Sequence, residues 1–187
     1  MACFASTLIP LLGDNEEKNI NALQNEISII AEIYKNKWLE EFSKKIGFEK
    51  THPEYEILIN RFLEILENEQ LDFTTSFRGL IKELDGKDNF ISNTDKFINW
   101  KNDWKKILEN KSNKKDVFKT ITSNNPAFIM RNHLVEKMIQ ELLNDKRDTL
   151  NKALLCMEKP YEELNQYEEM YVTPTKEQEV IKTFCGT

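Results

Sequence analysis

Residues 122–136, Thr-Ser-Asn-Asn-Pro-Ala-Phe-Ile-Met-Arg-Asn-His-Leu-Val-Glu, carry the clearest helix signal in the chain. Asn125 is a favourable N-cap, because its side-chain oxygen can accept a hydrogen bond from an unpaired amide of the first turn. Pro126 would then take the first helical position, where its missing N–H costs nothing. Apolar residues follow at intervals of three and four, at Met130, Leu134, Val135, Met138, Ile139, Leu142 and Leu143. The pattern predicts a helix that begins after Asn125 and buries a broad face.

Three polar residues, Arg131, Asn132 and His133, lie in the first two turns of this expected helix. In a structural interpretation, Arg131 pairs with a carboxylate, Asn132 holds a loop and His133 is a satisfied histidine. In a functional interpretation, they join Asn125 in an anion-binding site, because helix N-termini favour negative charge. The structural interpretation is the commoner outcome for such groups, and the sequence leaves both open.

Helical patterns continue along most of the chain and predict an all-α fold. We expect about seven helices in one irregular bundle. The first, over residues 2–12, should turn Cys3 and Phe4 inward, and an Asp14–Glu17 capping box should open a long second helix. Aromatic residues at helical spacing, at Phe97, Trp100 and Trp104, are expected to be core residues.

The lysine-rich stretch from residue 101 to residue 119 is expected to be a solvated face, with an exposed loop over residues 110–116. Pro160 should end the last helix, because proline disfavours helical geometry in the residue before it. We therefore expect a helical C-terminal domain over residues 1–160. An extended acidic tail should follow over residues 161–187 and end in Cys-Gly-Thr.

Composition narrows the partners of the chain. Its 187 residues carry a net charge of −6, which argues against a nucleic-acid partner. The apolar start is too short to cross a bilayer and lacks a basic region before it, so no membrane partner is expected. Three widely spaced cysteines, Cys3, Cys156 and Cys185, form no disulfide framework, and a cytoplasmic location is the expectation.

The sequence carries none of the common catalytic motifs. The five glycines are isolated, so no glycine-rich phosphate loop is present, and the kinase signatures are missing. The two histidines are far apart and predict no metal site. Cys185 is a candidate redox thiol because it lies near the chain end, yet Glu177 and Glu179 disfavour its thiolate. A redox role and an idle thiol both remain open for it.

Five stretches together resemble the C-terminal part of the selenoprotein O (SelO) family. They are residues 3–12, 74–80, 125–133, 160–161 and 183–187, in the order that the family shows. The resemblance covers nearly the whole chain but only about the last third of the family's usual length. One departure is Thr173-Pro174-Thr175, where the family more often carries paired prolines.

This resemblance implies a kinase-like protein adenylyltransferase, which transfers AMP from ATP to protein hydroxyl groups with a divalent metal such as Mg²⁺. The family's nucleotide and metal ligands belong to a kinase-like core upstream, so we expect no catalytic, cofactor-binding or metal-binding residue here. Cys185 matches a C-terminal cysteine that in bacterial members can form a disulfide with the core.

The chain is accordingly expected to be a C-terminal helical fragment of such an enzyme. It should be inactive by itself and have the missing kinase-like lobe as its partner. The alternative is a stand-alone helical module that binds another protein through its first helix.

Overall fold

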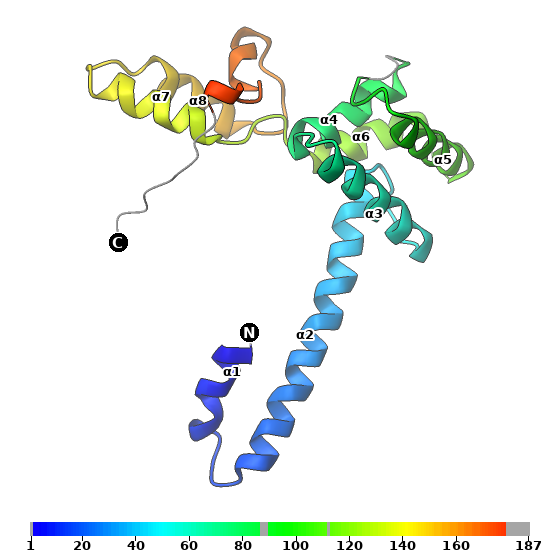
Figure 1. The fold of residues 1–187 in the computed structure, drawn as a ribbon, viewed down its shortest axis with the longest axis vertical. Helices are drawn as coiled ribbons and strands as arrows, with labels where there is room; N and C mark the ends of the chain where they lie inside the picture. The colour runs from blue at the N-terminus through cyan, green and yellow to red at the C-terminus, as the bar shows by residue number, and fades with distance from the viewer. Residues whose placement is uncertain (1, 87–89, 112, 179–187) are drawn as a thin grey trace. The chain divides into compact units, whose positions relative to one another are not determined.

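The computed structural model describes residues 2–86, 90–111 and 113–178, and within them it contains helices and no strand (Figure 1). The all-α prediction is confirmed. The elements are α1 (Ala2–Leu8), η1 (Ile9–Leu11), α2 (Glu16–Lys45), α3 (Pro53–Asn68), α4 (Phe73–Leu84), α5 (Asp95–Lys111), α6 (Lys114–Asn124), α7 (Asn132–Leu142), α8 (Asp148–Glu158), η2 (Asn165–Met170) and η3 (Lys176–Gln178). Among these elements, no helix is both long and apolar enough to cross a membrane.

The chain divides into two compact units, Met1–Phe42 and Ser43–Thr187. In the first unit, α2 begins one residue later than the predicted capping box requires. Asn15 is the capping residue, because its Oδ1 accepts a hydrogen bond from the amide of Lys18 at 3.0 Å. The prediction of an Asp14–Glu17 box is therefore wrong. The preceding turn uses Gly13 at a φ of +108°, which glycine adopts without strain.

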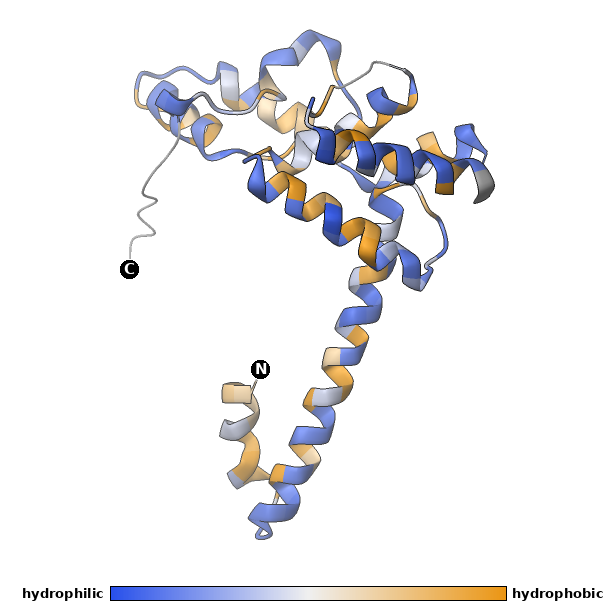
Figure 2. Ribbon diagram, turned by 45° about the vertical axis from the view of Figure 1, so that its right-hand side comes forward, coloured by the Kyte–Doolittle hydropathy of each residue, from blue (hydrophilic) through white to orange (hydrophobic). Residues whose placement is uncertain are grey.

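The first helix does not bury its apolar residues. Cys3 and Phe4 of α1 are both exposed, and so are Leu11 and Leu12 after it. The prediction that Cys3 and Phe4 face inward is thus wrong for this chain. Figure 2 shows the apolar colouring that covers much of α1.

The second unit has an aromatic core, as the spacing of the tryptophans predicts. Trp100 and Trp104 of α5 are fully buried and stacked, with ring centroids 5.5 Å apart. Their indole N–H groups donate to the backbone oxygens of Leu58 and Ile46, both at 2.8 Å. The ring of Phe62 from α3 stacks on Trp100 at 4.3 Å. Buried indoles keep a hydrogen-bond partner in this way while they fill the core.

One ion pair lies inside this core. Lys101 of α5 donates to Glu83 of α4 at 3.0 Å, and the Glu83 side chain is fully buried. The other carboxylate oxygen of Glu83 accepts the amide of Ile91 at 3.0 Å. Lys101 was expected on a solvated face. It is buried instead, because its ammonium group forms an ion pair with Glu83 that links α5 to α4.

The expected loop over residues 110–116 is also largely helical. The helix α5 continues to Lys111, and α6 begins at Lys114. Asn113 caps α6, because its Oδ1 accepts the amide of Lys115 at 3.1 Å. Val117 and Ile121 of α6 are buried, so packing makes this polar sequence helical.

The helices α7 and α8 share a smaller core with the segment after α8. Buried side chains of Phe128, Leu134, Met138, Ala153, Cys156 and Met170 form it. Cys156 is a buried free thiol. The buried side chain of Met170 in η2 shows that part of the segment expected to be a tail packs against the helices. Cys185 lies outside the described residues.

Candidate functional site

Asn125 lies at the C-terminal end of α6 and does not start a helix. Its backbone is extended, with φ −126° and ψ 109°, and α7 begins only at Asn132. Its side-chain Nδ2 donates to the backbone oxygens of Ile121 at 2.9 Å and Lys45 at 2.8 Å. The prediction that Asn125 caps the following helix is therefore wrong. Its side chain instead donates hydrogen bonds to backbone oxygens in the last turns of α6 and α2.

The backbone after Pro126 is held by the chain beyond α8. The amides of Ala127 and Phe128 both donate to the backbone oxygen of Pro160, at 2.7 and 3.0 Å. In a helix that started at Pro126, these two amides would belong to the first turn and point along the helix axis. Here they point instead to the oxygen of Pro160. The extended segment thereby delays α7 and ties residues 126–128 to residue 160.

Arg78 of α4 connects the same two segments, and sequence analysis missed this role. One guanidinium nitrogen, Nη1, donates to the backbone oxygens of Thr122 and Asn125, each at 3.1 Å. Nη2 donates to the backbone oxygen of Tyr161 at 3.1 Å, and Nε donates to Glu163 at 3.2 Å. Three stretches that carry the SelO resemblance therefore meet at one side chain. The only advance signal was the position of Arg78 within such a stretch.

Arg131 pairs with a carboxylate, as its structural interpretation requires. Nη1 and Nη2 donate to the two carboxylate oxygens of Asp72 at 2.7 and 2.9 Å. Asp72 also caps α4, because its Oδ1 accepts the amide of Thr75 at 2.8 Å. The pair therefore joins the residue before α7 to the N-cap residue of α4, in the bidentate geometry that arginine favours.

The electrostatics of Asp72 follow from these contacts. Burial alone would raise the pKa of its carboxyl group. The hydrogen bonds from Arg131 and Thr75, together with the positive charge of Arg131, outweigh burial and lower the pKa from 3.8 to about 2. Asp72 is consequently ionised at neutral pH, and Arg131 is engaged by a charge within the protein.

Asn132 and His133 differ from their structural interpretations. Asn132 is exposed, and no hydrogen bond of its side chain is seen within the described part of the chain. His133 is half-buried, and its Nδ1 is buried without a hydrogen-bond partner there. Burial lowers the pKa of His133, and the nearby charges of Arg131 and Lys137 lower it further. Neutral His133 thus sits beside a guanidinium that is already paired.

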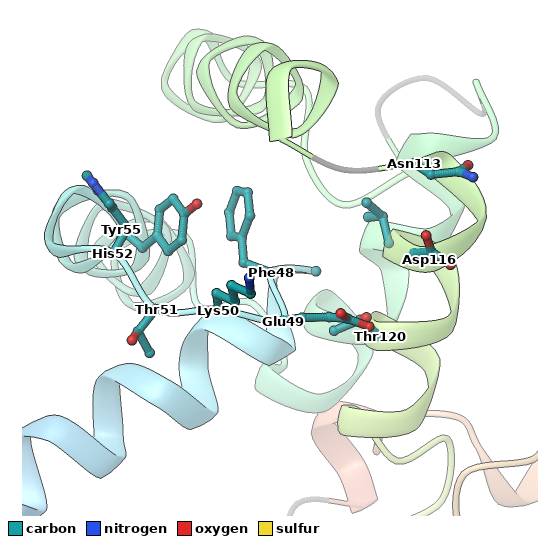
Figure 3. Close-up of a pocket in the computed structure, with 11 residues that line it drawn as sticks. Phe48, Glu49, Lys50, Thr51, His52, Tyr55, Asn113, Asp116 and Thr120 are labelled. Carbon is teal, nitrogen blue, oxygen red and sulfur yellow. The ribbon is translucent and has the colours of Figure 1, made fainter.

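A recess lies between the connection from α2 to α3 and the helix α6 (Figure 3). Its volume is about 510 Å³, and it is lined by Gly47, Phe48, Glu49, Lys50, Thr51, His52, Tyr55, Asn113, Asp116, Val117 and Thr120. The rings of Phe48 and Tyr55 are stacked with centroids 4.0 Å apart. Figure 3 shows Asp116 and Thr120 on α6, and Asn113 just before it, across the recess from those rings.

The charged groups of this recess lie at its rim. Glu49, Lys50 and Asp116 are exposed, whereas Phe48 and Tyr55 are buried. Exposed charges of both signs are well solvated, as is usual at a protein surface. Within residues 2–86, 90–111 and 113–178, no three His, Cys, Asp or Glu side chains could together hold a metal ion.

Comparison with known proteins adds the relationship that the geometry leaves open. The family model described as protein adenylyltransferase SelO matches residues 1–169. The protein nucleotidyltransferase YdiU of Bacillus mycoides (strain KBAB4) is 31% identical over 194 residues, and that of Bacillus cereus (strain ATCC 10987 / NRS 248) is 32% identical over 190. Each match covers 100% of this chain and 38% of the relative. The chain therefore belongs to the SelO family, and it spans little more than a third of the length of these relatives.

Proposed function

We propose that this chain is the C-terminal helical region of a SelO-type protein adenylyltransferase. The intact enzyme would transfer AMP from ATP to hydroxyl groups of proteins. In this proposal the chain supplies a scaffold for the catalytic part and is inactive by itself. The observation that carries the proposal is the full-length match to nucleotidyltransferases of which the chain spans 38%.

Among the described residues, those that line the recess of Figure 3 do not fit a site for Mg·ATP. Magnesium is usually held by one or two carboxylates together with the phosphate groups of the nucleotide, and a glycine-rich or helix N-terminal cradle binds those phosphates. The recess of Figure 3 offers Glu49 and Asp116, but both are exposed, and Asp116 occupies the first turn of α6. An acidic residue in that turn opposes an incoming phosphate. No catalytic step is therefore assigned to this chain.

The best-connected polar residues support a structural role instead. Arg78, Asn125 and Arg131 all lie in family-like stretches, and the side chain of each is hydrogen-bonded to groups of the same chain. Their hydrogen bonds set the ends of α4, α6 and α7. An anion-binding role for Asn125, Arg131, Asn132 and His133 would need Arg131 to leave Asp72.

The partner in this proposal is the kinase-like part of the same enzyme, and the location is the cytoplasm. Cys156 is a free, buried thiol, which suits a reducing compartment. The alternative partner is an unrelated protein that binds a stand-alone helical module. The exposed apolar residues of α1 favour some partner of either kind. Cys185 retains its proposed redox role only within the intact enzyme.

Two measurements test the proposal. Calorimetric titration of the isolated chain with Mg·ATP should give no binding heat. A fusion protein, in which the part of the Bacillus mycoides relative outside the match precedes residue 2, should label a protein substrate with AMP from labelled ATP, whereas the chain alone should not. Binding of Mg·ATP by the chain alone, or AMP transfer by it, would overturn the proposal. An inactive but folded fusion would favour the stand-alone module.

A further inference from the structure

The long helix α2 carries an apolar seam at coiled-coil spacing. Intervals of three, four, three and four residues separate its members, which are Ile20, Leu23, Ile27, Ile30 and Tyr34. These are the a and d positions of two successive heptads, and such positions lie along one face of a helix. Figure 2 shows apolar residues recurring along the helix.

The second half of this seam is open to solvent. Ile30 is 41% exposed and Tyr34 is 70% exposed, and Ile33 at the flanking g position is 61% exposed. Scattered apolar residues are normal on a protein surface, but a contiguous apolar patch marks an interaction site. On the opposite face, the f positions are polar, at Asn25 and Glu32.

The length of the seam distinguishes between two possible occupants. It spans two heptads, or roughly 21 Å at 1.5 Å per residue. A self-standing coiled coil is indicated by about three to four sustained heptads, so two copies of this chain would pair weakly. A segment tethered to the same molecule meets the seam at an effective concentration in the mM range, which makes a short seam sufficient.

The relatives provide such a tethered segment. The chain spans 38% of their length, so more than half of each relative lies outside the match. We propose that an α-helix from that remaining part of the SelO protein packs lengthwise on the seam from Ile20 to Tyr34. The inference deepens the proposed function, on which it rests for the identity of the partner.

The seam also defines the chemistry of its partner. A helix that packs between a and d positions presents its own branched apolar side chains at the same spacing. Glu17 and Glu26 lie at the e and g positions that border the first heptad. Lysine or arginine at the edges of the partner helix would complement them, and acidic residues there would repel them.

Hydrogen exchange tests the proposal in the fusion protein described above. In the fusion, amides of residues 20–34 should exchange at least about tenfold more slowly than in the isolated chain. Ile30→Asp should abolish this protection, and Tyr34→Asp should do the same. The matched control is Asn25→Asp, which adds the same charge on the polar face and should keep the protection. Equal exchange in fusion and isolated chain, or protection that survives Ile30→Asp, would overturn the proposal.

Two readouts separate this inference from its premises. An active fusion without protection of α2 would overturn the seam proposal and leave the enzyme assignment intact. Protection of α2 without AMP transfer would overturn the enzyme assignment and leave the seam proposal intact. Light scattering of the isolated chain at micromolar concentration should show a monomer. A dimer that Ile30→Asp dissolves and Asn25→Asp leaves intact would identify a second copy as the occupant and overturn the proposal.

Discussion

Arg131 and Asp72 are 59 residues apart in sequence, and two parallel hydrogen bonds of 2.7 and 2.9 Å join them. Their side chains are only 11% and 26% exposed. Asp72 is also the N-cap of α4, so one carboxylate both caps a helix and positions the start of α7. Local helix capping and long-range packing thus depend on the same group.

Arg131→Ala should lower the free energy of unfolding by about 2–3 kcal/mol, because it leaves a partly buried carboxylate without its charged donor. Urea denaturation at neutral pH measures this. The control is Arg61→Ala, which breaks the exposed pair with Asp103 and should cost less than about 1 kcal/mol. Equal losses for the two variants would contradict a special role for Arg131.

Acid should destabilise the protein through Asp72. The pKa of its carboxyl group is about 2 in the folded state, whereas an unperturbed aspartate of the unfolded chain has a pKa near 3.8. A depressed pKa stabilises the fold above the unfolded value, and this contribution is lost as pH falls through the range between the two values. Asp72→Asn should therefore be less stable at pH 7 and show a flatter stability profile between pH 4 and 2, about the two pKa values. A carboxyl NMR titration with a midpoint near 3.8 would rule this out.

His133 should act in a higher pH range. Its pKa is lowered from 6.5 by burial and by Arg131 and Lys137, so the folded state prefers the neutral ring. The stability that this group contributes is complete above pH 6.5 and falls as pH drops below it. His133→Phe should remove this part of the pH dependence and be neutral or stabilising at pH 7, because it eliminates the unpaired Nδ1. An NMR titration of the His133 imidazole with a midpoint above pH 6.5 would contradict a lowered pKa.

Removing one partner of the buried Lys101–Glu83 pair should lower the free energy of unfolding much more than replacing both partners. Lys101→Met leaves the Glu83 carboxylate in the core and should lower the free energy of unfolding by about 3–5 kcal/mol. Adding Glu83→Gln should recover much of that loss, since glutamine is uncharged and can still accept the amide of Ile91. Thermal denaturation of the single and double variants measures the difference. A double variant no more stable than Lys101→Met would refute the argument.

Gly47 should resist substitution for two separable reasons. Its φ of +95° is strained for any side chain, and an added Cβ would lie 2.7 Å from Cγ1 of Val117. Gly86 has a φ of +78° and no atom within 4 Å of an added Cβ. Gly86→Ala should therefore cost about 1 kcal/mol from strain alone, and Gly47→Ala clearly more. Equal losses in chemical denaturation would show that contact with Val117 adds nothing.

Elements with strong periodicity could be predicted from sequence. The buried tryptophans of α5 agree with their pattern, because the helical spacing of aromatic residues is a local property of the sequence. The start of α7 could not be predicted in this way. Asn125 and Pro126 form a good helix start locally, but two amides bound by Pro160 and a side chain bound by Lys45 override it.

The polar contacts of the candidate site were only partly predictable. A carboxylate partner for Arg131 was expected on general grounds, but its identity as Asp72 depends on how α4 and α7 pack. The burial of Lys101 could not be predicted either, because it also depends on how two helices pack. Its lysine-rich surroundings suggest a solvated face, whereas the side chain meets Glu83, which is 18 residues earlier in the sequence.

The hydrogen bonds of Arg78 have a consequence for how this region can diverge. Its partners at Thr122, Asn125 and Tyr161 are all backbone oxygens. Every amino acid has that oxygen, so the identities of these three residues can drift without loss of the bonds. Only arginine presents several planar donors in a fixed fork. Substitutions at Thr122 and Tyr161 should thus be tolerated better than substitutions at Arg78, whose side chain adds to the bonds of Pro160 in holding these segments together.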